Sequence, residues 1–405
     1  MFDCGDLAVF AGDLIGLKEY PLARKYSTFA QILILKLYFV IMKKIFTLSF
    51  IVVLFSCAGN KGDQIIHVSF PNPSEKVISW LDIFPDAEMI RLTGEQLPVL
   101  NPQGYLIVHD NMYYVIDPYH TSKIYRFNQN GRYMNSIGSR GRGPNEYLYL
   151  TDVMVDNYGN VAIFSTGTNA LLTYSPDGLL LERKEFPYSP ERFASLNGFN
   201  YHYMGIVGAG MDYRLYVTDN SGETIGTLLP APKSPARPNA QTFSLYGNTL
   251  NVCPPEGSEI YQLKDGKMEV TYRFDFGAHN IPDEYYTYST FNELSIFFTK
   301  GIAWKNAFYE NKHCAILWIV IEAPTEFRLI YGVLNKQKNV WKWFNGSEGD
   351  FIFLQYLDEE YAYLTASPQE MKQVPGMVER FPLLNTLTDD DDIVILKCKT
   401  ASVKL

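Results

Sequence analysis

The densest group of potential ligand-binding side chains in this 405-residue sequence runs from Ser139 to Tyr147 and reads SRGRGPNEY. Arg140 and Arg142 carry planar, fork-shaped donors that suit a carboxylate, a phosphate or a sugar hydroxyl. Glu146 can pair with either arginine. The segment is therefore either a structural connection held by an Arg–Glu pair or a contact for an anion or a glycan. A phosphate-binding P-loop is excluded, because its lysine and the Ser or Thr that follows it are missing.

Aromatic side chains form the second group of candidates, since the chain contains 29 Tyr and 26 Phe. Most of them occur in strand-like segments, where packing accounts for them. Tyr285, Tyr286 and Tyr288 occur in a different setting, within residues 280–300, where the pattern of strands is interrupted. We therefore expect these three tyrosines to be the aromatic residues that face a ligand.

The chain shows no short motif typical of a metal or catalytic centre. Its six histidines are scattered and form no HExxH or HxH pattern. Asp389–Asp392 lacks the spacing, the glycine and the terminal glutamate of an EF-hand, so a solvated acidic turn is the favoured interpretation. No GxSxG nucleophile motif occurs, and a pair of glycosidase carboxylates cannot be assigned from sequence spacing. We predict neither a metal nor a cofactor, and the sequence leaves any catalytic residues unassigned.

Charge and cysteine content narrow the functional classes. The formal net charge is −9, and the sequence has no basic stripe, which argues against nucleic acid as a partner. Cys253, Cys314 and Cys398 stand in apolar segments and form no CxxC pair. We expect them to be buried, reduced thiols, with one disulfide among the three as the alternative.

The N-terminal region is typical of an export signal. Residues 42–56 combine two lysines with an apolar run that is too short to span a membrane, and Cys57 follows directly. The end of this run resembles the lipobox of bacterial lipoproteins, which implies cleavage before Cys57 and lipidation of that cysteine. Residues 57–64 would be a lipidated tether, and residues 1–41 a mis-called upstream extension. The alternative, a transmembrane anchor over residues 29–55, is disfavoured by the three lysines within it.

The resemblance to lipoproteins also implies a location. The residue after Cys57 is not aspartate, which by the same resemblance favours delivery to the outer membrane over retention at the inner membrane. The protein would then contact a membrane through its lipid anchor.

A repeat organises the middle of the chain. Strand-like segments flank four turns that end in glycine, at Gly131, Gly178, Gly222 and Gly266, with spacings of 47, 44 and 44 residues. Glycine supplies the positive φ angle that tight hairpins need. A second hairpin precedes the first two of these turns, so each repeat would hold four antiparallel strands. A period of 40–50 residues with four strands is typical of a β-propeller blade.

The repeats predict a single all-β domain over residues 65–405, a β-propeller with six blades. The expected blades lie near residues 103–138, 152–186, 200–230, 241–276 and 311–345, with a sixth over 351–398 that the strand at 65–70 would complete. Residues 280–300 read as a partly helical insertion, because Pro282 and acidic residues precede irregularly spaced apolar positions. Seven blades is the alternative, since residues 277–310 can hide further strands.

Three parts of the sequence carry a family resemblance: residues 130–147 with the GRGPxEY string, residues 155–163 with a DxxGN hairpin, and Asp389–Asp392 before a final apolar strand. They resemble a large family of uncharacterised six-bladed β-propeller lipoproteins that are relatives of the NHL-repeat and TolB-like propellers. The resemblance implies the fold and a location in the bacterial envelope. It implies no activity.

Two functional hypotheses follow from a complete scaffold without a catalytic motif. The leading one is a non-catalytic binding or interaction module for a glycan, a peptide or a partner envelope protein. The alternative is an extracytoplasmic polysaccharide hydrolase, or a metal-dependent lyase, with acidic residues or histidines around a central channel. A structural subunit of an envelope complex is a third, weaker hypothesis, which requires a large exposed apolar patch.

Overall fold

The structure is a computed structural model that describes residues 65–70, 74–95, 100, 104–205, 211–232, 241–264, 267–288, 290–297, 300–346, 352–388 and 393–405. The predicted extension, signal peptide, tether and lipidation site at Cys57 therefore lie outside the described residues. Gly266 and Asp389–Asp392 lie outside them as well.

The Asn/Asp–Gly turns form hairpins for the reason that the sequence suggests. In the first turn, the Asn128 side chain accepts hydrogen bonds from the backbone N–H groups of Asn130 (3.0 Å) and Arg132 (3.1 Å). Gly131 then adopts a φ of 77°. In an equivalent turn, Asp219 accepts from the N–H groups of Ser221 and Glu223. Side-chain caps and a left-handed glycine thus reverse the chain between consecutive strands.

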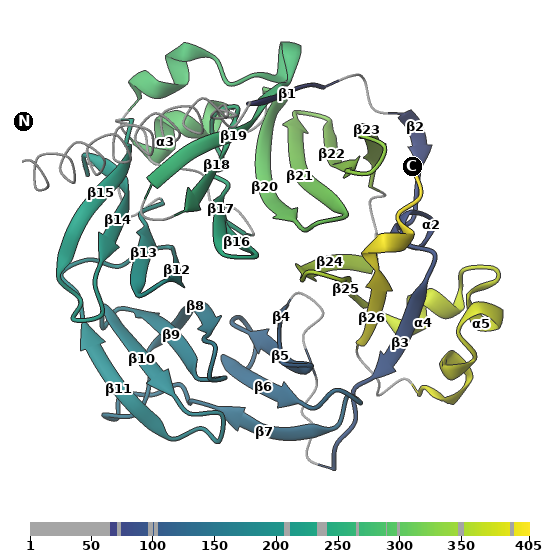
Figure 1. The fold of residues 1–405 in the computed structure, drawn as a ribbon, viewed down its shortest axis with the longest axis horizontal. Helices are drawn as coiled ribbons and strands as arrows, with labels where there is room; N and C mark the ends of the chain where they lie inside the picture. Colours follow the sequence, from purple (N-terminus) through teal and green to yellow (C-terminus); the bar gives the residue numbers. More distant parts are fainter. Residues whose placement is uncertain are drawn as a thin grey trace, which may run out of the picture. The chain divides into compact units, whose positions relative to one another are not determined.

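Six sheets of antiparallel strands are arranged in a ring, as Figure 1 shows. Blade 1 contains β4 (Tyr105–His109), β5 (Met112–Asp117), β6 (Lys123–Phe127) and β7 (Tyr133–Ile137). Blade 2 contains β8 (Tyr149–Val155), β9 (Val161–Thr166), β10 (Ala170–Tyr174) and β11 (Leu180–Glu185). Blade 3 contains β12 (Arg192–Leu196), β13 (Phe199–Tyr203), β14 (Tyr213–Thr218) and β15 (Thr224–Pro230).

The second half of the ring follows the same plan. Blade 4 contains β16 (Phe243–Tyr246), β17 (Thr249–Val252), β18 (Glu259–Lys264) and β19 (Lys267–Asp275). Blade 5 contains β20 (Ile302–Glu310), β21 (Cys314–Ala323), β22 (Glu326–Asn335) and β23 (Val340–Asn345). Blade 6 contains β24 (Ile352–Leu357), β25 (Tyr361–Ala366), β26 (Val394–Lys399) and β3 (Ala87–Arg91). The prediction of six four-stranded blades is confirmed.

The closure of the ring corrects the sequence prediction. The strand that completes blade 6 is β3, in which Ile90 is paired with Ile395 of β26. The strand at 65–70, expected in that role, forms β1 (Ile66–Ser69) and lies parallel to β19 at the outer edge of blade 4. A second added strand, β2 (Ser74–Val77), lies parallel to β23 in blade 5. The short helix α2 (Trp80–Ile83) connects β2 to β3 and begins at a capping box of Ser79 and Asp82.

The interrupted region near residues 280–300 is partly helical, as predicted. It contains η3 (Gly277–His279), η4 (Asp283–Thr287), α3 (Phe291–Leu294) and η5 (Ser295–Phe297). Among its described residues, the interrupted region of the repeat contains one strand, β20. It is the inner strand of blade 5, so there is no seventh blade. Between β25 and β26 lie α4 (Pro368–Lys372), α5 (Met377–Arg380) and η6 (Pro382–Thr386), and η7 (Thr400–Ser402) follows β26. No helix in the described ranges has the length and hydrophobicity to cross a membrane.

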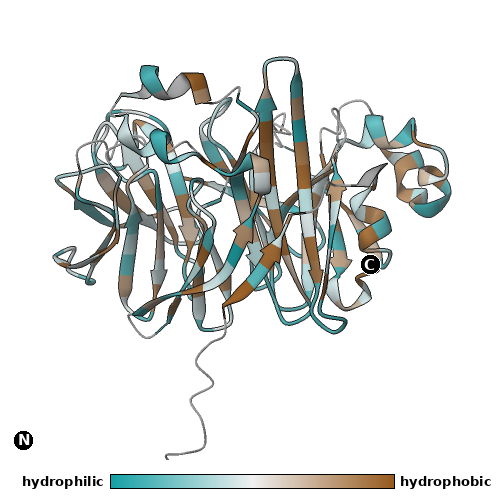
Figure 2. Cartoon of the chain, turned by 90° about the horizontal axis from the view of Figure 1, so that it is seen from above, coloured by the Kyte–Doolittle hydropathy of each residue, from teal (hydrophilic) through white to brown (hydrophobic). Residues whose placement is uncertain are grey.

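The core lies between the blades. Facing sheets bury apolar side chains against each other, as with Leu364 and Leu396 of blade 6 beside Ile316 and Val333 of blade 5, all fully buried. Seen from the side, hydrophobic residues run along the strands and hydrophilic ones gather in the loops (Figure 2). The three described cysteines are buried free thiols, which confirms the expected state of Cys253, Cys314 and Cys398.

The direction of the strands defines two faces of the ring. The connections between blades, such as residues 138–148, 186–191 and 276–301, lie at one end of the inner strands, which we call the crossover face. The loops that join the second and third strands of blades 1, 2, 4 and 5 lie at the same face. The remaining hairpin turns lie at the opposite end, the hairpin face.

Candidate functional site

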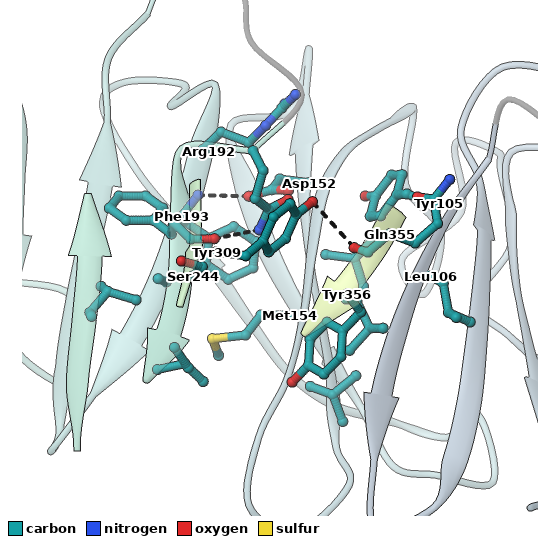
Figure 3. Close-up of a pocket in the computed structure, with 18 of the residues that line it drawn as sticks. Tyr105, Leu106, Asp152, Met154, Arg192, Phe193, Ser244, Tyr309, Gln355 and Tyr356 are labelled. Carbon is teal, nitrogen blue, oxygen red and sulfur yellow. Dashed lines mark hydrogen bonds between the residues drawn. The ribbon is translucent and has the colours of Figure 1, made fainter. Parts of the chain in front are cut away.

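The inner strand of each blade contributes side chains to the central channel, which contains a cavity of about 100 Å³. The lining is a mixture of aromatic and polar groups. It includes Tyr105 from β4, Asp152 and Met154 from β8, Arg192 and Phe193 from β12, Ser244 from β16, Tyr309 from β20, and Gln355 and Tyr356 from β24 (Figure 3). Such a mixture, in which few polar groups stand among aromatic rings, is typical of ligand sites.

Three polar side chains from successive blades line the cavity at its crossover-face end. Tyr105 and Arg192 are the first residues of their strands, and Asp152 lies between them on β8. Figure 3 shows the three together at one end of the cavity. The Asp152 carboxylate accepts a hydrogen bond of 2.7 Å from the Phe193 N–H. We call these three residues the mouth cluster.

The electrostatics of the mouth cluster are set by burial and by two carboxylates. Burial raises the pKa of Asp152 to about 6, although Arg192 and the backbone N–H groups of Phe193 and Val153 act to lower it. Burial acts to lower the pKa of Arg192, but Asp152 and then Glu191 raise it more, so the guanidinium stays charged. One cation therefore stands beside two carboxyl groups.

The Tyr105 hydroxyl is the unusual member of the cluster. It is buried and forms no hydrogen bond within the described part of the chain. Burial, followed by the charge of Asp152, raises the pKa of Tyr105 well above its usual value, so the hydroxyl keeps its proton. Leaving such a group without a partner costs about 1–3 kcal/mol. An unpartnered hydroxyl on a residue that lines the cavity is a candidate contact for a ligand.

The raised pKa of Asp152 can be tested through its effect on the free energy of unfolding. Because its folded pKa is raised, the folded protein keeps a proton between pH 3.8 and about 6 that the unfolded chain has released, so stability falls as pH rises through this window. Asp152→Asn is therefore expected to raise the free energy of unfolding by about 2 kcal/mol at neutral pH and to have little effect at pH about 4. Urea denaturation at both pH values measures this. A variant that is less stable than the wild type at neutral pH would contradict it.

The loop around Arg140, Arg142 and Glu146 lies at the crossover face, between β7 and β8. The Glu146 carboxylate accepts a 2.7 Å hydrogen bond from the Gly143 N–H. Buried Tyr147 anchors the loop by donating from its hydroxyl to the Ser122 carbonyl. The expected Arg–Glu clamp is thus replaced by a carboxylate that caps its own loop.

The two arginines of this loop are exposed. The guanidinium carbon of Arg140 lies 5.5 Å from the centre of the Tyr149 ring. The two arginines thus lie at the rim of the crossover face and not in the channel. That they contact a ligand there remains a prediction.

The three predicted tyrosines have different environments. Tyr285 has no exposed surface and packs against Phe297 and Trp304, so the prediction that it faces a ligand is corrected. The cause is local, since η4 turns this ring onto the start of β20. Tyr286 and Tyr288 are half-buried.

Tyr286 lines a surface pocket of about 540 Å³ beside β1. The polar groups there bind mainly one another: Arg273 pairs with Glu259 at 3.3 Å, and Asn280 donates to Asp275 at 2.9 Å. These two pairs leave the other polar groups of the pocket without an assigned role.

The alternative hypothesis places a catalytic or metal site of acidic residues or histidines around the channel. Within the described ranges, no group of three or more His, Cys, Asp or Glu side chains is placed to hold a metal ion. His202 lies in the core between blades 2 and 3, where its ring packs against Phe186 and Tyr188. His279 binds the Gly301 carbonyl with its Nδ1 at 2.6 Å in the insertion.

The mouth cluster was missed by sequence reasoning. The sequence prediction began blade 3 at residue 200 and so omitted β12, the strand that carries Arg192. Asp152 was placed at the start of blade 2 without a role. Their place in the repeat could have identified them. Both are polar residues on the inner strand of a blade, and the inner strands line the channel.

Solved structures share this architecture. A protein of Bacteroides fragilis that is provisionally described as exported is 17% identical, with a TM-score of 0.70, over 84% of this chain and 100% of its own. A member of the DUF4221 family from Bacteroides vulgatus is 12% identical, with a TM-score of 0.50, over 78% of this chain and 98% of its own. At these identities, the similarity shows the fold alone. No curated protein is significantly similar in sequence.

The family described as "Domain of unknown function (DUF4934)" matches residues 64–399, which cover the whole propeller. The chain is therefore a member of the DUF4934 family.

Proposed function

We propose that this protein is a non-catalytic binding module of the bacterial cell envelope. It binds a glycan, a peptide or a partner envelope protein at the mouth of the propeller channel, on the crossover face. The observation that carries the proposal is the mouth cluster, in which Tyr105, Asp152 and Arg192 converge from three blades and the Tyr105 hydroxyl has no partner among the described residues.

The composition of the channel supports binding over hydrolysis. Glycoside hydrolysis commonly uses two carboxyl groups about 5–10 Å apart on either side of the bond that breaks. Among the described residues that line the cavity, Asp152 supplies one carboxyl group. The nearby Glu191 carboxylate packs against Gly205, where an added Cβ would lie 1.6 Å from its Oε2 atom. Within the described ranges, no second carboxyl group lines the cavity.

An envelope location is supported by the lipobox-like sequence at Cys57 and by the exported protein of the same fold. We propose that lipid on Cys57 anchors the protein, with the outer membrane as the site of delivery. β1 runs parallel to β19, so its first residue lies at the hairpin face. A tether of eight residues spans at most about 28 Å.

Tyr105→Phe tests the binding site. The variant removes one buried hydroxyl and keeps the ring, so it is expected to leave the free energy of unfolding unchanged or to raise it by about 1 kcal/mol. Binding should become about tenfold weaker, because the ligand loses the hydrogen bond that this hydroxyl offers. The probes are a glycan array, a peptide array and detergent-solubilised envelope proteins, followed by titration of each hit.

Tyr158→Phe is the matched control, since Tyr158 is 86% exposed in the β8–β9 turn at the hairpin face. It should change neither stability nor binding. Equal affinities for the wild type and Tyr105→Phe would place the binding site elsewhere. Turnover of a polysaccharide by the purified protein would overturn the non-catalytic assignment.

A further inference from the structure

We infer that the part of the ligand bound at the channel mouth is an uncharged sugar residue, hydrogen-bonded by the mouth cluster and stacked on Tyr119. This inference rests on the proposed binding function and names the ligand class of that site. It uses one residue outside the cavity, Tyr119, which follows β5 in the loop that joins β5 to β6 at the crossover face.

Tyr119 is an exposed ring on a rigid turn. It is 78% exposed, so packing does not explain its position. The turn beneath it is fixed by the fully buried Asp117. The Asp117 carboxylate accepts hydrogen bonds from the backbone N–H groups of Tyr119 (3.3 Å), His120 (2.9 Å) and Thr121 (2.9 Å). The backbone that carries the ring is thus organised before a ligand arrives, which lowers the entropy cost of binding.

Tyr119 follows the strand that pairs with the strand of Tyr105. In the β4–β5 ladder the partner of Tyr105 is Ile116, three residues before Tyr119. A flat aromatic ring beside a group of polar side chains suits a ligand with one apolar face and hydroxyls around its edge, and a sugar ring has this character.

The hydrogen-bonding groups of the mouth cluster fit hydroxyls. The Asp152 carboxylate accepts, the Arg192 guanidinium donates, and the Tyr105 hydroxyl does both. A sugar hydroxyl also donates and accepts, so neighbouring hydroxyls can bond to the carboxylate and the guanidinium together, in addition to the bonds that these groups already form with the Phe193 N–H and the Glu191 carbonyl. The Tyr105 hydroxyl, which no described residue satisfies, would gain its partner in the same step.

The charge of the mouth disfavours an acidic ligand. The positive charge of Arg192 is offset by Asp152 and Glu191, the two carboxyl groups that act most strongly on its pKa. A carboxylate, phosphate or sulfate at this position would meet no net positive charge and would have to lose its hydration. An uncharged polyol avoids that cost.

The small cavity limits how much of the ligand enters. At about 100 Å³, the space below the mouth is smaller than the 300–1,000 Å³ of ordinary ligand pockets. Only a terminal unit would reach the mouth cluster, and the rest of a saccharide chain would lie across the crossover face. Tyr149, which is 56% exposed beside Arg140, lies on this face at the start of β8.

The test compares three ligand classes on one array with the full-length protein: uncharged oligosaccharides, oligosaccharides that bear uronate or sulfate, and unmodified peptides. We expect uncharged oligosaccharides to bind. Tyr119→Ala should raise the Kd about tenfold, and the matched control Tyr158→Ala should leave it unchanged. The Kd should also change less than about twofold between about 0.05 and 0.5 M NaCl, because no ligand charge is screened.

The other outcomes separate the two proposals. Preferred binding of uronate- or sulfate-bearing oligosaccharides, weakened by salt, would overturn the uncharged sugar and leave a binding module. Binding of peptides alone would do the same. Equal affinities of the wild type and Tyr119→Ala for an uncharged oligosaccharide would overturn the stacking contact. Absence of binding to all three classes and to envelope proteins would overturn both the sugar and the proposed function.

Discussion

Replacing Gly131 with alanine is expected to lower the free energy of unfolding by about 4 kcal/mol or more, which is at the upper end for a single substitution. An added Cβ at this position would lie 2.0 Å from the Arg91 carbonyl oxygen, and the residue has a φ of 77°. The Gly131 carbonyl also accepts a 2.8 Å hydrogen bond from the Thr93 N–H. Gly131 thus holds the end of β3 against blade 1, and a methyl group there would push apart the junction that closes the ring.

Gly222→Ala is the matched control, because Gly222 occupies the equivalent turn of blade 3 with a φ of 88°. Its added Cβ would approach no atom closer than the flexible Lys184 side chain, at 3.4 Å. Only the strain of the positive φ remains, so we expect a loss of about 1–2 kcal/mol. Urea denaturation monitored by tryptophan fluorescence measures both variants. Equal losses would show that contact with β3 contributes nothing beyond the turn.

The second large effect concerns pH. Burial lowers the pKa of His202 from 6.5 to about 4. Between these values the unfolded chain binds a proton that the folded protein does not, so the free energy of unfolding falls as pH falls through this window. The contribution of His202 to that loss is about 3 kcal/mol. The aromatic rings around His202 explain it: Phe186 and Tyr188 lie 5.0 and 5.6 Å from its ring, and neither offers a negative charge.

His202→Gln isolates this contribution. Glutamine can still contact the Thr218 hydroxyl, which lies 3.1 Å from His202 Nε2, but it does not titrate. The stability difference between wild type and His202→Gln is therefore expected to shift by about 3 kcal/mol, in favour of the variant, from pH about 7 to about 4. The wild type and the variant must be compared at each pH, because Asp152 makes the free energy of unfolding change with pH in the opposite direction to His202. The exposed His120→Gln variant serves as the control. Parallel pH profiles of wild type and His202→Gln would contradict the account.

The repeat of turns was the part of the fold that the sequence predicted well. Asn128, Gly131, Asp219 and Gly222 act locally, since a cap and a positive φ reverse the chain without help from the rest of the protein. The spacing of such turns therefore fixed the size of a blade and, with it, the number of blades.

Ring closure could not be predicted in the same way. The segments that form β1 and β3 are both short and partly apolar, so their sequences do not distinguish the sheet edge with which each one pairs. Which one completes blade 6 depends on tertiary contacts such as Ile90 with Ile395 and the Thr93–Gly131 hydrogen bond.

The mouth cluster was even harder to predict from the sequence than ring closure. Asp152 and Arg192 lie 40 residues apart in sequence, and their approach depends on the register of two inner strands in different blades. Tyr285 and Tyr286 show the same limit on a smaller scale. The two are adjacent, yet one is fully buried and the other lines a pocket, because η4 sets the direction of each ring.

The most direct test of the central claim is a crystal structure of the protein with an oligosaccharide that the array identifies. We expect a terminal sugar at the crossover-face mouth of the channel, over the Tyr119 ring and within hydrogen-bonding distance of Tyr105, Asp152 and Arg192. A ligand bound elsewhere, such as in the pocket beside Tyr286, with the channel mouth empty, would contradict it.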